Sequence, residues 1–534
     1  MLFNSYVFMF VFLPVVLAGY ALLARIGGRR AALGWLTISS LFFYGWWNPA
    51  YLVLLGLSIL VNFTLGRYLA MRTADARQGG VNPSSLPLIF GIVFNLGLII
   101  YFKYAGFLVS NVNAIAGSSW DIGTVILPLA ISFFTFQQIT YLVDTHGGAP
   151  NEPSLLNYTL FVSFFPQLIA GPIVHHSEMM PQFRDQSRKA LSAENLSVGL
   201  TLFAIGLFKK AVLADGIAVY ATPVFAASDA GEPIDLLTAW GGALAYTFQL
   251  YFDFSGYCDM AMGAARLFGI TLPINFNSPY KSVNIIDFWR RWHITLSRFL
   301  RDYVYIPLGG NRRGMARRYI NLAATMLIGG LWHGAGWTFV VWGGLHGLYL
   351  VVNHGWLWIK KRIFANAGHS TWIGRRLGQL ITFVAVVFAW VYFRSVSFEG
   401  ANGLVLAMVG QSGITLPSAI FSALGPLADV LAGFGITASD GGGGRFVATW
   451  GWIIALATIA FLAPNSIDLM RSHRPVIDTP DITMEPRSGP GQWLRGFEHR
   501  EWHPRPSWVA ATAFLLTLGI LALPEVSEFL YFQF

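Results

Sequence analysis

The sequence is poor in charged residues, which make up only 11% of its 534 residues, whereas 55% are hydrophobic. In a soluble protein, roughly a quarter of all residues would be charged. The deficit excludes an ordinary soluble domain and predicts a chain that lies in lipid. The net charge is nevertheless +9. Because the basic residues stand in short loops between apolar runs, they indicate cytoplasmic loops of a multi-pass membrane protein and not nucleic-acid binding.

Cysteine is nearly absent, and several catalytic motifs are missing. The single Cys258 excludes an internal disulfide and a multi-cysteine metal site, and its apolar neighbours predict a small buried side chain. No HExxH-type spacing joins the histidines, and no GxSxG supplies a serine nucleophile. We therefore expect no metal and no permanently bound cofactor. No internal repeat is visible, which disfavours an inverted-repeat transporter.

Long apolar runs fill most of the chain. They predict an all-α integral membrane protein with roughly eleven to thirteen transmembrane helices of about 20 residues each, together with re-entrant or interfacial helices. Pro166, Gly171 and Pro172 interrupt one run, residues 158–174, which we expect to be broken or re-entrant. The expected spans are 7–24, 31–46, 50–69, 86–102, 124–143, 197–214, 236–253, 319–332, 335–352, 378–393, 447–463 and 508–523.

The first run indicates the orientation of the chain. Arg25, Arg29 and Arg30 follow residues 7–24 and nothing basic precedes them, so the positive-inside rule predicts a periplasmic N-terminus. We interpret this run as a membrane helix and not as a signal peptide, because a basic start and a cleavage site are missing. The stretch 466–507, with six basic and six acidic residues, is expected to be a polar loop. One membrane domain over 1–534 is the simplest organisation.

Residues 275–347 combine a basic half with an apolar half. Nine Lys and Arg stand against two Asp between Lys281 and Arg318. The segment 285–305 cannot be an ordinary span, because each buried arginine would cost about 2–3 kcal/mol or more. Its apolar residues recur at helical spacing, so we expect a helix at the cytoplasmic interface or one that dips into the protein. The arginines either anchor the chain to anionic lipids or meet an anionic cofactor such as coenzyme A.

The apolar half carries His333 and His346. An imidazole within a membrane segment is costly, and this marks a candidate functional site. Glycines surround His333, which permits the close approach of a substrate or simply of another helix. His346 is thirteen residues further on and would lie off that face on one unbroken helix. His293, in the basic half, is by itself more typical of a structural histidine. A buried imidazole stays neutral and can act as a general base for acyl transfer to a hydroxyl.

These segments resemble the membrane-bound O-acyltransferase (MBOAT) family, in its bacterial polysaccharide-acetylating branch of the alginate O-acetylation type. The resemblance covers most of residues 1–395. It departs from the usual pattern only mildly, with Cys258 for Ser and Asp287 for Glu. The segments that carry it are YFDFSGYCDMA (251–261), NFNSPYKS (275–282), DFWRRWHITLSRFLRDYVYIPLGGNR (287–312), GGLWHGAGWTFVVWGGLHG (329–347), the N-terminal MLFNSYVFMFVFLP, FPQLIAGPIV and WVYFR (390–394).

The resemblance implies a ring of tilted helices around a central tunnel, with His333 as the catalytic histidine and His293 as a second functional histidine. We add donor- or substrate-binding candidates: Trp332, Asn277, Arg290, Arg291, Asp287 and His346.

The implied function is O-acetyl transfer in the bacterial inner membrane, from cytoplasmic acetyl-CoA to a polysaccharide such as alginate, with a periplasmic acetyltransferase partner. Two alternatives stay open at this point. One is D-alanyl or other acyl transfer to a cell-wall polymer. The other is a transporter of a polysaccharide or lipid-linked sugar, with His333 as a proton relay.

Overall fold

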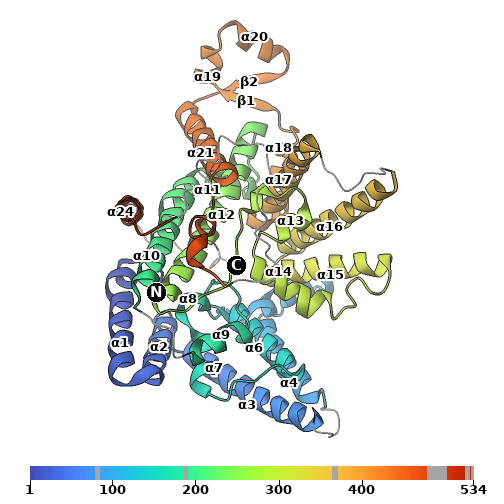
Figure 1. Ribbon diagram of the computed structural model, residues 1–534. Coiled ribbons are helices and arrows are strands. Elements are labelled where there is room, and N and C mark those ends of the chain that lie inside the picture. Colours follow the sequence, from blue (N-terminus) through green and yellow to red (C-terminus); the bar gives the residue numbers. More distant parts are fainter. Residues whose placement is uncertain (78–83, 186–190, 364–370, 478–501, 524–529, 531–534) are drawn as a thin grey trace. The chain divides into compact units, whose positions relative to one another are not determined.

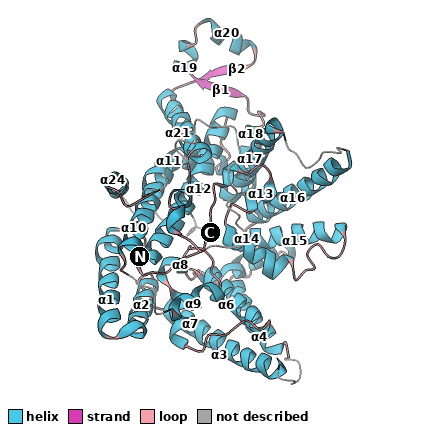
Figure 2. Cartoon of the chain, in the orientation of Figure 1, coloured by secondary structure: helices cyan, strands magenta, loops and turns pink. Residues whose placement is uncertain are grey.

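The chain is almost entirely helical in the computed structural model, which describes residues 1–77, 84–185, 191–363, 371–477, 502–523 and 530 (Figure 2). In this described part the strands are β1 (Ile414–Pro417) and β2 (Ile436–Ser439), which pair in parallel with Ile414 opposite Ile436. The predicted all-α class is thus confirmed. The chain divides into two compact units, each assembled from separate stretches. The prediction of a single membrane domain over 1–534 stays a prediction.

Unit 1 comprises Met1–Phe208, Gly256–Asn275 and Ser466–Gln533. Its elements, where η marks a π or 3-10 turn, are η1 (Phe8–Phe12), α1 (Leu13–Ile26), α2 (Gly28–Gly45), α3 (Tyr51–Arg77), α4 (Leu86–Ile99), η2 (Ile100–Tyr104), α5 (Ala105–Ala116), α6 (Ile131–His146), α7 (Leu155–Ser163), α8 (Phe165–Leu168), α9 (His176–Arg184), α10 (Ala193–Phe208), the end of α12 (Leu236–Leu267), α22 (Ser466–Leu469), η6 (Arg471–His473) and α24 (Pro506–Leu521) (Figure 1).

Buried amides and small residues hold the helices of unit 1 together. Asn62 on α3 and Asn95 on α4 exchange side-chain hydrogen bonds of 3.2 and 2.6 Å. A Cβ at Gly206 on α10 would overlap the carbonyl oxygen of Gly256 on α12, so these two backbones touch. Such contacts are the means by which helices associate in lipid, where burial of apolar surface gives little gain. Cys258 is buried, as predicted.

The predicted interruption in residues 158–174 is confirmed. Helix α7 ends at Ser163, the one-turn α8 follows, and the chain is then non-helical up to α9. Its freed backbone groups find partners inside the protein: the N–H of Phe165 donates to Ser40 Oγ at 3.2 Å, and that of Ala170 to the Tyr257 hydroxyl at 3.3 Å. A break at membrane depth is tolerated under this condition.

Unit 2 comprises Lys209–Ser255, Phe276–Asn465 and Phe534. With the two strands, its elements are η3 (Lys209–Ala214), α11 (Asp215–Asp229), the larger part of α12, η4 (Pro279–Lys281), α13 (Ile285–Trp289), α14 (Ile294–Leu300), η5 (Arg301–Tyr305), α15 (Met315–His333), α16 (Trp337–Ile363), α17 (Trp372–Arg394), α18 (Phe398–Met408), α19 (Ser418–Ala423), α20 (Pro426–Gly433) and α21 (Gly443–Leu462) (Figure 1).

The helices α15 and α16 form a closely packed hairpin in unit 2. A Cβ at Gly330 would overlap the carbonyl oxygen of Phe339, and one at Gly343 would lie 2.5 Å from that of Met326. The glycines around His333 therefore do permit close backbone approach. Elsewhere in the unit, buried Lys210 pairs with the equally buried Asp253 at 2.8 Å.

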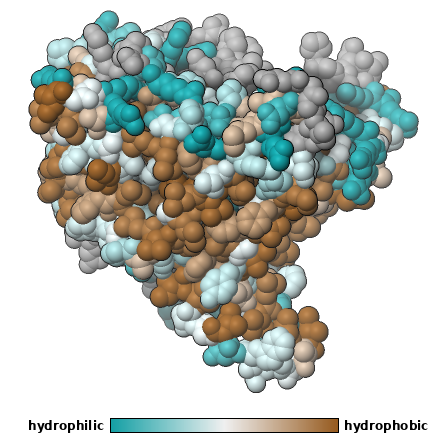
Figure 3. Space-filling view, turned by 90° about the horizontal axis from the view of Figure 1, so that it is seen from below, coloured by the Kyte–Doolittle hydropathy of each residue, from teal (hydrophilic) through white to brown (hydrophobic). Residues whose placement is uncertain are grey.

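Six described helical segments are long and apolar enough to cross a membrane, and Pro506–Leu521 is a shorter apolar helix. Apolar side chains cover a large part of the face in Figure 3. The protein is an integral membrane protein. Several predicted boundaries were wrong. The helix expected over 124–143 begins only at Ile131, and the one expected over 236–253 continues to Leu267. The helical segments expected to end at 69, 102, 214 and 352 continue to Arg77, Ala116, Asp229 and Ile363. Within the predicted polar loop 466–507, residues 478–501 lie outside the described part.

Candidate active site

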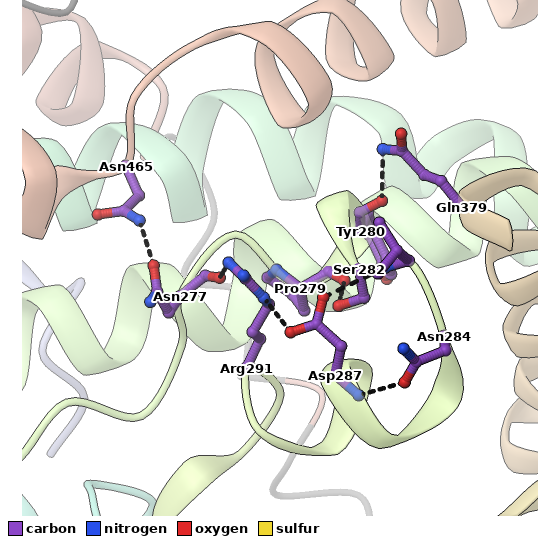
Figure 4. Close-up of polar contacts among 10 residues, drawn as sticks. Asn277, Pro279, Tyr280, Ser282, Asn284, Asp287, Arg291, Gln379 and Asn465 are labelled. Atoms are coloured by element: carbon purple, nitrogen blue, oxygen red, sulfur yellow. Dashed lines mark hydrogen bonds and ion pairs between the residues drawn. The ribbon is translucent and has the colours of Figure 1, made fainter. Parts of the chain in front are cut away.

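A polar network shapes the loop that leads to His293, within unit 2 (Figure 4). Arg291 Nε donates to Asp287 Oδ1 at 2.7 Å, and the backbone N–H of Asn277 donates to the carbonyl of Arg291 at 2.9 Å. The side chain of Asn465 donates to Asn277 Oδ1 at 3.0 Å. Asn284 caps α13 by accepting from the N–H of Asp287. These contacts join residues 277–291 into one braced loop.

His293 lies where this loop turns into α14. Its side chain is fully buried, and its φ of +44° puts the backbone in the left-handed region, which is uncommon for a residue other than glycine. Strain of this kind costs about 1–3 kcal/mol and is held in place by surrounding structure. The ring packs edge-on against Phe254 at a centroid distance of 4.9 Å. Burial lowers the pKa of His293 to about 3, so its imidazole is neutral.

His333 is the last residue of α15, and its side chain is buried. Helix α15 ends there because Gly334 is extended, and a Cβ at Gly334 would overlap the ring of Phe339. Three rings surround the imidazole edge-on at centroid distances of 4.9, 5.0 and 5.1 Å; they belong to Trp332, Trp342 and Phe393. The side chain is thus held in an apolar, low-dielectric environment.

The two predicted histidines meet. The ring centroids of His293 and His333 are 6.3 Å apart, and the ring of Trp332 lies 6.0 Å from that of His293. On one straight helix, residues 40 positions apart would be separated by about 60 Å. The braced loop and the α15–α16 hairpin therefore bring the two histidines together. At this distance the two imidazoles are in edge-to-face contact, so one reacting group can be reached by both rings.

His346 lies one helical turn beyond Trp342 on α16. Its ring is fully buried, and neither ring nitrogen has a hydrogen-bond partner among the described residues. The rings of Trp342 and Trp289 stand edge-on to it at 4.8 and 5.1 Å. Since α16 starts only after the break that follows His333, both histidines contact Trp342 and the off-face argument for one unbroken helix does not apply. His346 lies beside the histidine pair and not in it.

The predicted binding residues fall into two groups. Trp332 and His346 lie in the buried aromatic cluster around His333. Asn277, Asp287 and Arg291 belong to the braced loop, whereas the side chain of Arg290 is exposed. A role of these residues in binding the donor or the substrate stays a prediction, as do the catalytic roles of His293 and His333.

Sequence reasoning missed the aromatic residues that enclose the pair, namely Phe254, Trp342 and Phe393. Two weak signals point to them. Phe393 lies in the segment WVYFR, and Trp342 precedes His346 by four residues, which places both on one face of a helix. Aromatic residues are so frequent in this chain, at 15%, that neither signal stands out.

Two buried imidazoles in contact suit proton transfer or nucleophilic attack at a carbonyl. Among the residues that the structure describes, no group of three or more His, Cys, Asp or Glu could hold a metal ion. Comparison with known proteins agrees with this chemistry. Residues 148–395 match the model of the MBOAT, membrane-bound O-acyltransferase, family. The peptidoglycan O-acetyltransferase of Helicobacter pylori is 47% identical over 442 residues, which cover 78% of this chain and 81% of that protein.

More distant relatives carry related names. The probable alginate O-acetylase AlgI of Pseudomonas aeruginosa is 40% identical over 76% of this chain and 75% of its own length. The teichoic acid D-alanyltransferase of Streptococcus thermophilus is 30% identical over 50% of this chain and 68% of its own length. The chain belongs to the membrane-bound O-acyltransferase family. It is an O-acyltransferase, as the resemblance implied.

Proposed function

We propose that the protein is an inner-membrane O-acetyltransferase that moves an acetyl group from cytoplasmic acetyl-CoA towards the hydroxyl groups of an extracytoplasmic polysaccharide. The observation that carries this proposal is the buried pair His293–His333, with ring centroids 6.3 Å apart inside an aromatic enclosure. Relatives named for peptidoglycan and alginate acetylation support the acetyl group and the polysaccharide acceptor.

In the proposed reaction, neutral His333 takes the proton of the accepting hydroxyl while the oxygen adds to the thioester carbonyl. The C–O bond forms, the C–S bond breaks, and the coenzyme A thiolate leaves and is protonated. His293, on the other side of the reacting carbonyl, stabilises the developing oxyanion as a hydrogen-bond donor from its neutral ring. The accepting hydroxyl belongs to the polysaccharide or to a periplasmic acetyltransferase partner that completes the transfer.

In this proposal the basic residues of the segment 281–318 bind the acetyl donor. Arg290, Arg312 and Arg317 have exposed side chains, and the segment precedes and enters α15, which ends at His333. Exposed guanidinium groups suit the phosphates of coenzyme A. By the positive-inside rule this segment faces the cytoplasm, and the N-terminus faces the periplasm.

D-Alanyl transfer is supported less well. The relative named for it matches at 30% over half of the chain, against 47% over more than three quarters for the acetyltransferase. Because the chain belongs to an acyltransferase family, we do not favour the alternative that it is a transporter.

Purified full-length protein in lipid nanodiscs, supplied with radiolabelled acetyl-CoA, tests the donor. We expect label to be lost from acetyl-CoA in a His333-dependent manner and to appear in ester linkage. Protein that leaves acetyl-CoA untouched but consumes a D-alanyl thioester would contradict the proposal.

A further inference from the structure

A pocket away from the histidines lies in unit 2, at the start of α21. Its cavity volume is about 200 Å³, and it is partly open to solvent. It is thus smaller than the roughly 300–1,000 Å³ of an enclosed small-ligand site and has room for only part of a long ligand. Helices α11, α12 and α21 and the edges of the two strands form its walls. In Figure 1, β1, β2, α19 and α20 lie together beyond the N-terminal end of α21.

The lining combines flat aromatic rings with hydroxyl and charged groups. Tyr220, Phe446 and Trp450 supply the rings, and Asp440 and Arg445 supply a carboxylate and a guanidinium group. The guanidinium is fixed by a 3.0 Å hydrogen bond from Nη2 to the carbonyl of Val219. The hydroxyl-bearing lining residues are Thr238, Thr415, Ser439 and Thr449. Rings that pack on apolar C–H faces, beside donors and acceptors for hydroxyl groups, are the chemistry of a saccharide site.

Two observations assign the pocket to the face opposite the basic segment. Residues 395–444, which contain both strands, hold no Lys or Arg, whereas Lys360, Lys361, Arg362, Arg375 and Arg376 flank the other end of α17. The far end of α21 is tied to the basic segment, because Lys281 Nζ donates to the carbonyl of Ala463 at 2.6 Å. By the positive-inside rule the pocket then faces away from the cytoplasm.

Helix α12 connects the pocket to the histidines. Gly242 lines the pocket, and Phe254, twelve residues along the same helix, packs against His293. At 1.5 Å per residue this separation is about 18 Å. A ligand in the pocket therefore does not react there. A polymer that reaches the histidines, however, can place a remote part of its chain in the pocket.

The charge of the face that carries the pocket determines which polymers can bind there. The charged residues of this face are six acids, which outnumber its two arginines, Arg394 and Arg445: Asp229, Glu232, Asp235, Glu399, Asp429 and Asp440. A face of this sign repels a polyuronate and tolerates a glycan of low charge.

We propose that this pocket is a remote subsite for the acceptor, and that it binds a low-charge glycan chain. The identification of the ligand as the acceptor rests on the proposed function. Saccharide binding at the pocket can nevertheless be measured without any acetyl donor. Binding at a distance from the reacting centre contributes to catalysis by holding a long acceptor in place.

Isothermal titration of full-length protein in nanodiscs with a hexamer of N-acetylglucosamine, and separately with a hexamer of mannuronate, tests the proposal. We expect the neutral hexamer to bind more tightly than the anionic one. Trp450→Ala and Tyr220→Ala should each weaken its binding about ten-fold or more. Phe434→Ala is the matched control, because this ring belongs to the segment 395–444, is 80% exposed and does not line the pocket.

His333→Ala should bind the neutral hexamer as wild type does, which separates this test from that of the acetylation chemistry. If Trp450→Ala fails to fold, Tyr220→Ala and the milder Trp450→Phe carry the test. Unchanged binding in both folded pocket variants would overturn the proposal. Tighter binding of the mannuronate hexamer would also overturn it. A wild-type protein that binds neither hexamer would overturn it too and would favour a segment of a partner protein as the occupant of the pocket.

Discussion

At the scale of single residues, the candidate site depends on how His293 is presented. The residue adopts a left-handed backbone conformation that side chains rarely accept, and its ring is fully buried between Phe254 and the ring of His333. The braced loop of Asn277, Asp287 and Arg291 holds this conformation. Residues in such conformations concentrate at functional sites, where the surrounding structure stabilises them.

We predict that His293→Asn lowers acetyl transfer by about 10²–10⁴-fold, the usual contribution of a positioned acid–base group. Asparagine tolerates the left-handed conformation, so the melting temperature should stay close to that of wild type. His293→Val should lose stability as well, because a β-branched residue is strained at a positive φ. Transfer assays and thermal unfolding of both variants check this. Full activity in His293→Asn would exclude a catalytic role for the ring.

The sequence was informative about these residues to different degrees. His293 and His333 stand in long motifs, and both reach the same site. The network around Asn277 and Asp287 was not predictable, because single-sequence patterns do not show which polar groups will meet. The enclosing Trp342 and Phe393 were invisible for a related reason: an aromatic residue in an apolar helix fits a lipid-facing position as well as a buried one.

At the scale of elements, the α15–α16 hairpin fixes the position of His333. Its glycines let the two backbones touch near the end of α15. From the sequence, the glycines around His333 were compatible with the close approach of either a substrate or another helix. The sequence did not predict that the preceding basic segment breaks into α13, α14 and η5, because short turns with several backbone bends leave no periodic pattern.

We predict that Gly343→Ala lowers the stability of the hairpin by about 1–3 kcal/mol, because its Cβ would lie 2.5 Å from the carbonyl oxygen of Met326. Gly355→Ala on the same helix α16 is the matched control. Nothing lies within 4 Å of a Cβ there, so higher helix propensity should stabilise that variant by up to about 1 kcal/mol. Thermal unfolding in detergent measures both. Equal melting temperatures would contradict the tight packing.

A second element-scale prediction concerns the pair Lys210–Asp253, which ties η3 to α12. Lys210→Met leaves the buried carboxylate of Asp253 without its cation and should cost about 3–5 kcal/mol of stability. The double variant Lys210→Met with Asp253→Leu should recover much of this loss, because the fully buried carboxylate is gone. Asp215, which Lys210 also contacts at 2.8 Å, is partly exposed and can be solvated. A double variant no more stable than the single one, in the same unfolding assay, would argue against the ion pair as the cause.

At the scale of the whole molecule, composition alone was sufficient to predict the membrane class, and the long apolar runs were sufficient to predict the all-α fold. Hydropathy was less reliable for individual spans. The helix expected from residue 124 begins at Ile131, and α12 extends past the residue at which its apolar run was expected to end. Protein-facing polar residues such as Asp253 and Asp259 end an apolar window without ending a helix, which explains the second error.

The orientation of the molecule can be tested by labelling, since the only native cysteine, Cys258, is buried. A cysteine at exposed Ala438, in the segment that lacks Lys and Arg, should react with an impermeant maleimide in intact spheroplasts. A cysteine at exposed Arg376, in the basic flank of α17, should react only after permeabilisation. The reverse pattern would invert the proposed topology and would place the pocket on the cytoplasmic side.

Whether His333 is the base of an O-acetyl transfer can be measured through the ester-linked acetate on the cell's extracytoplasmic polysaccharide. Four strains are compared: wild type, one without the protein, His333→Ala, and His354→Ala as a control histidine that contacts Arg318 and not the aromatic enclosure. We expect acetate in wild type and His354→Ala only, with normal polymer export in all four strains. Normal acetate in a folded His333→Ala protein would contradict it.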